Sequence, residues 1–90
     1  MSIGSMHFEK KADALNFLKE MLNRYRPGEI VSEVDAGFLM DALDRHPDST
    51  EKIGVGVGHF EVQSADYGTQ CFCVVRVDKT REKFSYKSCI

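Results

Sequence analysis

The sequence contains no tryptophan, only two prolines and three cysteines, and no long apolar run in its 90 residues. An odd number of cysteines does not suit a disulfide framework, so we expect the thiols of Cys71, Cys73 and Cys89 to be reduced. No segment approaches the roughly 20 apolar residues that cross a bilayer, and residues 1–5 lack the features of a signal peptide. These absences predict a cytoplasmic protein that does not enter a membrane.

Patterns that bind metals or cofactors are absent as well. Cys71 and Cys73 lie two positions apart in an expected strand and supply at most two soft ligands, whereas zinc needs about four. The histidines at positions 7, 46 and 59 are not spaced as in metal-binding fingers. We therefore expect neither a metal nor a cofactor, since small buried thiols explain the cysteines.

The charged side chains are nearly balanced in number but unevenly distributed along the chain. The formal net charge is −2, yet residues 1–51 carry six basic and ten acidic side chains, and residues 52–90 carry six basic and four acidic ones. The apolar fraction of 42% is ordinary for a folded domain. We expect one domain over residues 1–90, with residues 1–5 as a flexible tail. Its C-terminal half is less basic than a strong nonspecific nucleic-acid binder.

The first half of the chain shows apolar residues at helical spacing. A first amphipathic helix is expected over residues 11–26, and Pro27-Gly28 ends it because proline disfavours helix in the residue before it. Ser32 begins a capping box, which predicts a second helix over residues 33–45. Val34 is expected on the buried face of that helix.

The second half changes to an alternating pattern after an expected polar loop over residues 48–51. Valine and isoleucine occupy one face of an expected strand that begins at Lys52, and glycine occupies the other. The apolar positions change parity near Gly58, which predicts a β-bulge. Residues 71–77 are apolar on both faces, as in a central strand, and a last strand is expected over residues 82–86.

This order of elements defines the fold class. Two helices precede three strands that short turns join, which is an α+β arrangement. We expect two N-terminal helices packed on one face of a small antiparallel sheet of three to four strands.

The glycines of the first expected strand leave two explanations open. Glycine allows backbone amides to approach a phosphate closely, but a phosphate-binding loop lies between a strand and a helix. Here Gly54 and Gly56 alternate within the expected strand, and no helix follows. They either contact a ligand or let a neighbouring element pack closely on the bare face.

Two further side chains invite a chemical role. His46, followed by Pro47, stands at the expected end of the second helix, where an imidazole acts as an acid or base or hydrogen-bonds the helix end. An enzyme would need a carboxylate beside it, and Asp44, Asp48 and Glu51 are candidates only by their place in the sequence. Cys89 as a nucleophile would need an activating base, and a packing role suits it better.

Positive charge and aromatic rings occur together in the last two expected strands. Arg76 accompanies Phe72 in one strand, and lysines accompany Phe84 and Tyr86 in the other. Aromatic faces stack on unpaired bases while Lys and Arg bind phosphates, and one sheet face can present both. The same rings can instead point into the core.

The order of these motifs resembles a known family. Arg45-His46-Pro47, the run over residues 52–57, the run over residues 71–78 and the run over residues 84–90 resemble the DCL-type domain, named for plant "defective chloroplasts and leaves" proteins. In that family a glycine usually follows the aspartate that matches Asp78, whereas Lys79 stands here. The chain resembles a stand-alone bacterial member whose function the resemblance does not define.

The resemblance implies a link to RNA. Plant members are associated with the maturation of chloroplast ribosomal RNA, and a similar domain lies at the end of the largest subunit of plant-specific RNA polymerases. The family supplies no catalytic residues to transfer, so the matching positions are motif features of unknown role. These features are His46, Pro47, Gly54, Gly56, Asp78, Ser85 and Cys89.

The sequence therefore predicts a non-catalytic domain that binds RNA or assists RNA processing. The alternative is a protein-interaction module that docks on a larger RNA or transcription assembly, and an enzyme acting through His46 is a third hypothesis. The residues expected to bind RNA are Lys52, Arg76, Lys83, Phe84 and Lys87.

Overall fold

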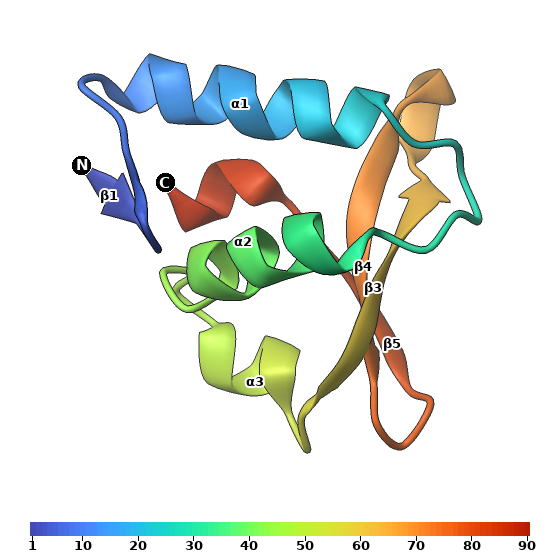
Figure 1. The fold of residues 1–90 in the computed structure, drawn as a ribbon. Coiled ribbons are helices and arrows are strands. Elements are labelled where there is room, and N and C mark those ends of the chain that lie inside the picture. Colours follow the sequence, from blue (N-terminus) through green and yellow to red (C-terminus); the bar gives the residue numbers. More distant parts are fainter.

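Three helices and two antiparallel sheets form the computed structural model, which describes residues 1–90 (Figure 1). The expected α+β class, with two N-terminal helices packed on one face of a small antiparallel sheet, is confirmed. No helix is long and apolar enough to cross a membrane. In chain order the elements are β1 (Ser2–Ile3), β2 (Met6–His7), α1 (Lys11–Asn23), α2 (Glu33–Leu43), α3 (Ser49–Ile53), β3 (Val57–Ser64), the 3-10 turn η1 (Asp66–Gly68), β4 (Gln70–Arg76), β5 (Arg81–Phe84) and the 3-10 turn η2 (Tyr86–Cys89).

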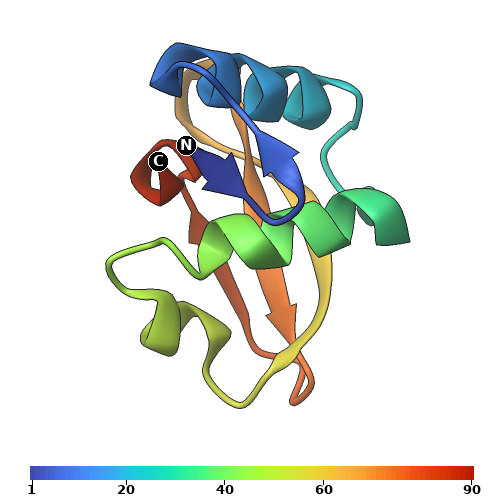
Figure 2. The same ribbon diagram turned by 60° about the vertical axis from the view of Figure 1, so that its left-hand side comes forward.

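The core lies between the helices and one face of the β3-β4-β5 sheet. Figures 1 and 2 show α1, α2 and η2 on the same side of this sheet. Val62, Phe72 and Phe84 stand opposite one another across the three strands, and all three are buried. Leu18 of α1 and Leu39 of α2 are buried in the same cluster. Each such side chain contributes about 1.5–3 kcal/mol when it leaves water, so this layer accounts for most of the stability.

Helices α1 and α2 follow the local sequence signals. The predicted cap of α2 is confirmed, because the Ser32 hydroxyl accepts a hydrogen bond of 3.3 Å from the Asp35 backbone N–H. The Asp35 carboxylate in turn accepts a bond of 2.6 Å from the Tyr25 hydroxyl, which fixes the chain between the two helices. Val34 does not belong to the buried face, as it is 84% exposed.

The expected strand from Lys52 to Gly58 is wrong in its first half. Residues 49–53 form helix α3, so the polar loop predicted over residues 48–51 is also wrong. Gly54 and Gly56 then turn the chain with φ of +54° and +120°, values that favour glycine. The strand β3 begins only at Val57. The predicted bulge is confirmed, because the register shifts between Val57 and His59.

The N-terminal residues form a hairpin instead of the flexible tail predicted for residues 1–5. Ser2 pairs with His7, and Ile3 pairs with Met6. Ile3 is 1% exposed and belongs to the core. The buried Ile3 anchors this short hairpin. Each strand has only two residues, which is too short for an alternating pattern to predict it.

The edges of the larger sheet differ from each other. The central position predicted for β4 is confirmed, and β3 is bordered by the segment 28–31, in which Val31 N–H donates to Phe60 O over 2.9 Å. On the other side, β5 ends at Phe84 opposite Phe72, and the chain turns into η2 instead of continuing to Tyr86 as predicted. β4 therefore extends two residues beyond its last pair with β5.

Candidate functional site

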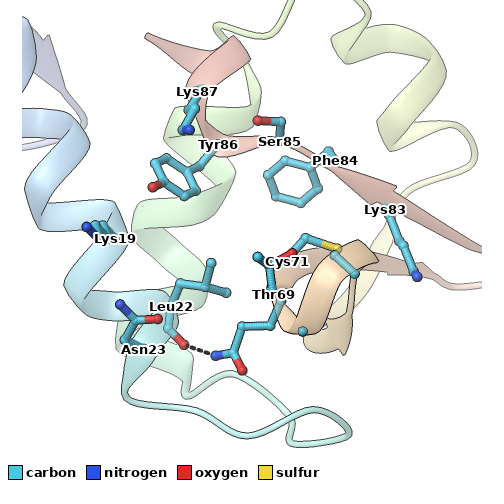
Figure 3. A pocket seen from close by; sticks show the side chains of 13 residues that line it. Lys19, Leu22, Asn23, Thr69, Cys71, Lys83, Phe84, Ser85, Tyr86 and Lys87 are labelled. Carbon is cyan, nitrogen blue, oxygen red and sulfur yellow. Dashed lines mark hydrogen bonds between the residues drawn. The ribbon is translucent and has the colours of Figure 1, made fainter.

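A pocket of about 750 Å³ lies where β5 stops short of β4. Its walls come from the C-terminal half of α1, the β3–β4 turn, the start of β4, and the end of β5 with η2 (Figure 3). A volume of this size falls in the range of sites for small molecules, about 300–1,000 Å³. The pocket is lined by Lys19, Leu22, Asn23, Ala65, Gly68, Thr69, Gln70, Cys71, Lys83, Phe84, Ser85, Tyr86 and Lys87.

Gln70 joins the two walls of this pocket. Its side-chain N–H₂ group donates to the backbone carbonyls of Leu22, at 2.7 Å, and of Tyr25, at 2.8 Å. Leu22 lies in the last turn of α1 and Tyr25 lies two residues beyond its end, a place where carbonyl groups lack partners in the regular helix pattern. The contact thus satisfies carbonyls at the helix end and fixes the end of α1 against β4.

The pocket carries unneutralised positive charge. Three lysines line it, Lys19, Lys83 and Lys87, which we call the pocket lysines, and no aspartate or glutamate lines it. None of the three forms an ion pair. Figure 3 shows Lys19 and Lys87 beside Tyr86, with Lys83 at the opposite end. Lys83 donates to the Ser64 carbonyl over 2.7 Å, a neutral partner that leaves its charge uncompensated.

The aromatic side chains near the pocket differ in accessibility. Phe84 is buried at 4% exposure and lies between Phe60 and Phe72, with ring centroids about 6 Å apart, so its ring face belongs to the core. Tyr86 is half-buried and meets Phe72 edge to face. Tyr67, one position before the lining residue Gly68, is fully exposed.

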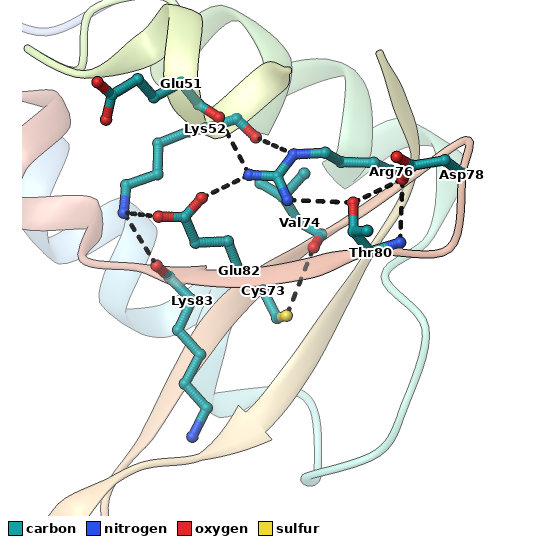
Figure 4. A network of polar contacts seen from close by, with 9 residues as sticks. All are labelled: Glu51, Lys52, Cys73, Val74, Arg76, Asp78, Thr80, Glu82 and Lys83. Carbon is teal, nitrogen blue, oxygen red and sulfur yellow. Dashed lines mark hydrogen bonds and ion pairs between the residues drawn. The ribbon is translucent and has the colours of Figure 1, made fainter. Parts of the chain in front are cut away.

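Lys52 and Arg76 lie away from this pocket, in a second group of charges that we call the Glu82 cluster (Figure 4). The Lys52 ammonium contacts one Glu82 carboxylate oxygen at 2.8 Å, and the Arg76 guanidinium contacts the other. The two basic side chains are only 17% and 12% exposed. The prediction grouped these two residues with Lys83 and Lys87. In the structure Lys52 and Arg76 do not line the pocket, although the Lys52 ammonium contacts the Lys83 backbone carbonyl at 3.4 Å.

The Glu82 cluster secures helix α3. Arg76 donates to the carbonyl of Glu51 at 3.0 Å and to the carbonyl of Lys52 at 3.1 Å. A methyl group on Gly54 would lie 2.8 Å from the Arg76 Nε, so this glycine makes room for the guanidinium. Close packing therefore explains Gly54. Gly56 faces Val77, and its φ of +120° explains its identity.

Three carboxyl groups are stabilised in their ionised form. Hydrogen bonds from Lys52 and then Arg76 lower the pKa of Glu82. On the open face of the sheet, a hydrogen bond with His59 lowers the pKa of Glu61, with smaller help from Gln63 and Arg81, against the opposing effect of burial. Hydrogen bonds from Thr80 lower the pKa of Asp78 in the β4–β5 turn. None of the three carboxyl groups lines the pocket with the three lysines.

The His46 imidazole holds the turn that follows α2. Its Nδ1 accepts a hydrogen bond of 3.0 Å from the Asp48 N–H, and the backbone N–H of His46 donates to the Leu43 carbonyl at 2.9 Å. Neither His46 nor the exposed Pro47 lines the pocket. The imidazole therefore has a structural partner, but this partner is the Asp48 N–H and not the last carbonyls of α2 that were the expected alternative to acid–base chemistry.

The remaining motif features divide between the fold and the pocket. Cys89 is buried, burial raises its pKa to about 11, and its carbonyl accepts from the Arg45 Nε at 3.0 Å. Ser85 is exposed and lines the pocket. Lys79, which follows Asp78, keeps the left-handed backbone of a glycine turn with φ of +74°. All three cysteines are free thiols, and no three His, Cys, Asp or Glu side chains form a metal site.

Several pocket residues were not predicted. Lys19 belongs to the exposed side of α1, and only the packing of α1 against β4 and η2 brings it to Lys87. Asn23 at the end of α1 meets the adjacent residues Thr69 and Gln70 at the start of β4 for the same reason. No local signal connects them.

These features define a small α+β domain with a lysine-lined pocket at the open end of its sheet. The chain belongs to the family described as "Protein of unknown function (DUF3223)", whose model matches residues 19–90. The solution NMR structure of an uncharacterised protein from Rhodospirillum rubrum is 62% identical to it, with a TM-score of 0.96. That comparison covers all of this chain and 86% of the other.

Two proteins of Arabidopsis thaliana are also similar. One is the DNA-directed RNA polymerase IV subunit 1, which is 43% identical over 74 residues, or 81% of this chain and 5% of the subunit. The other is the protein EMBRYO DEFECTIVE 514, which is 24% identical over 92 residues, or all of this chain and 46% of that protein. The chain thus spans less than half of either plant relative.

Proposed function

We propose that this domain is a non-catalytic RNA-binding accessory that uses the lysine-lined pocket. The observation that carries the proposal is the set of three pocket lysines with neither an ion pair nor a carboxylate beside them. Lysines in this state attract phosphates, because binding releases counter-ions from the nucleic acid. The proposal keeps Lys83 and Lys87 from the expected set. It adds Lys19 and leaves out Lys52, Arg76 and the buried Phe84.

The relatives support a setting in RNA metabolism. A similar segment occurs in the DNA-directed RNA polymerase IV subunit 1, a protein whose name describes RNA synthesis. The motif order resembles the DCL-type domain, and that resemblance implies ribosomal RNA maturation. We infer that the domain serves as an accessory to such an assembly.

The chemistry of the pocket favours binding over catalysis. Its potential nucleophile is Cys71, and burial raises the pKa of that thiol, which leaves it protonated and a weak nucleophile. The other polar lining groups are amides, hydroxyls and ammonium groups, which orient an anion. A role without a cofactor is therefore proposed.

The test compares two variants of equal charge. In the pocket variant, Lys19, Lys83 and Lys87 are changed together to Gln. In the control variant, Lys10, Lys11 and Lys79 are changed to Gln, because they are exposed, form no ion pair and lie outside the pocket. Binding of an RNA hairpin with a single-stranded tail is measured at several salt concentrations.

The pocket variant should lose roughly 10- to 100-fold in affinity at low salt. Its slope of log affinity against log salt should fall by about 2, at roughly 0.7 per lost phosphate contact. The control variant should lose much less. Equal losses in both variants, or no binding by the native protein at high micromolar concentration, would overturn the proposal.

A protein-interaction module is the second candidate, favoured by the free end of β4. Gln70 and Cys71 extend beyond the last pair with β5, so a peptide strand of a partner has a sheet edge to join. Partners in an RNA or transcription assembly would then stay bound after nuclease treatment. RNA-mediated partners would be released.

A further inference from the structure

We propose that the pocket selects unpaired RNA, with a base stacked on Tyr67 at its rim. This inference rests on the proposed function and specifies its ligand. A duplex hides the faces of its bases inside its own stack, and only an unpaired base offers a face to an aromatic side chain.

Tyr67 is the first observation. Its side chain is fully exposed and its backbone adopts φ of +61°, a left-handed conformation that a bulky residue rarely takes. The other two tyrosines have structural partners, since Tyr25 donates to Asp35 at 2.6 Å and Tyr86 meets Phe72. Strain held at a position where the ring stabilises nothing in the fold is typical of a functional residue.

The turn that carries Tyr67 is well fixed. Thr69 donates to the Asp66 carbonyl from its hydroxyl at 2.6 Å and from its backbone N–H at 3.2 Å. The Ala65 N–H donates in turn to the Thr69 carbonyl at 2.9 Å. Tyr67 is therefore displayed on a braced turn directly before the lining residue Gly68, which reduces the entropy lost when a base binds.

The positions of the lysines suit a short strand. Lys19 and Lys87 lie at one end of the pocket and Lys83 at the other, with Tyr86 next to the first pair (Figure 3). Phosphates on either side of an inserted nucleotide would meet these two ends. A strand that follows this path has its bases free to turn toward the rings.

The floor of the pocket offers hydrogen bonds to a base. Both donor contacts of the Gln70 amide go to the carbonyls of Leu22 and Tyr25, so its oxygen accepts no hydrogen bond from the chain and is free for a ligand. Asn23 and Ser85 add exposed polar groups. This mixed set would accept several bases, so we expect tolerance of sequence together with discrimination between single strand and duplex.

The test uses Tyr67→Asn, because asparagine tolerates the left-handed backbone and removes the ring. The probes are a single-stranded RNA of about ten nucleotides, within the range of single-strand site sizes, and a fully paired duplex of the same length. Affinities of the native protein, Tyr67→Asn and the pocket variant are compared at one salt concentration.

Tyr67→Asn should weaken single-strand binding roughly 5- to 100-fold and leave duplex binding unchanged. The pocket variant should weaken both. If Tyr67→Asn changes neither affinity while the pocket variant weakens both, unpaired-strand selection is wrong and the proposed function stands. If the pocket variant has no effect, the proposed function is wrong as well.

A fluorescence measurement gives an independent readout. The chain has no tryptophan, so Tyr67→Trp introduces a single reporter at the rim. Its emission should be quenched by the single strand and not by the duplex. Val77→Trp, at an exposed position outside the pocket, is the matched control and should not respond. Equal quenching at both positions would contradict stacking at Tyr67.

Discussion

The Glu82 cluster and the pocket lysines use the same kind of side chain in opposite ways. Lys52 and Arg76 are mostly buried and both pair with the Glu82 carboxylate, which compensates one of their two charges, and Arg76 holds α3 to the sheet. The pocket lysines have no carboxylate partner. A cation that is already paired stabilises the fold, whereas an unpaired cation remains available to an external anion.

Among the changes that test this comparison, Glu82→Gln should have the largest effect on stability. Removing the carboxylate leaves two mostly buried cations uncompensated, which should cost about 2 kcal/mol, discounted because Glu82 itself is 39% exposed. Urea denaturation measures the loss. RNA affinity at a temperature where the variant is folded should stay the same. A native midpoint in urea would show that the cluster does not hold the fold.

Acid should destabilise the fold by protonating the paired carboxylates Glu61 and Glu82. The folded-state pKa values of Glu61 and Glu82 are lowered from the ordinary 4.5, so their stabilisation is complete above about pH 4.5 and is lost as pH falls through the lowered values. The free energy of unfolding should therefore decline below that pH. Glu82→Gln should show a shallower decline. A stability that stays flat down to pH 3 would contradict this.

Lys79→Gly tests a lysine that belongs to neither group. Its φ of +74° costs a non-glycine residue roughly 1–2 kcal/mol, and glycine returns about 0.5–1 kcal/mol in chain entropy. A net stabilisation of about 0.5 kcal/mol is expected by thermal or urea unfolding. RNA affinity should change little, because this lysine lies outside the pocket. A destabilised variant would mean that Lys79 has a role in the turn.

The smallest stability effect is expected for the pocket variant. Its lysines are exposed and unpaired, so the change to Gln should alter the free energy of unfolding by less than about 0.5 kcal/mol. The same variant should show the large loss in RNA affinity. A loss of stability as large as that of Glu82→Gln would remove the distinction between the two regions.

Local signals predicted the local parts of the fold. The spacing of apolar residues in α1, the Ser32 cap, the bulge before His59 and the apolar run of β4 were all confirmed. Helix α3 was missed because it has five residues, and Arg76, 25 positions beyond Glu51, supplies its C-terminal partners. The alternation of glycine with valine after Ile53 favoured a strand that begins at Lys52, so the helix was not predicted.

The candidate site was predicted only in part, because local signals indicate single residues but not contacts between distant ones. Lys83 and Lys87 stood out because the C-terminal half is basic and aromatic, but their setting depends on where β5 stops. Lys52 and Glu82 are 30 positions apart, so their pairing could not be read from the sequence. Lys19 reaches the pocket only through the packing of α1.

Amide chemical-shift mapping with a single-stranded RNA tests the central claim most directly, and a chain of 10.2 kDa suits it. The largest changes should lie around the pocket, at Lys19, Gly68, Thr69, Lys83 and Lys87, with small changes at Lys52, Arg76 and Glu82. Changes centred on the Glu82 cluster, or none at saturating RNA, would contradict the assignment of binding to the pocket.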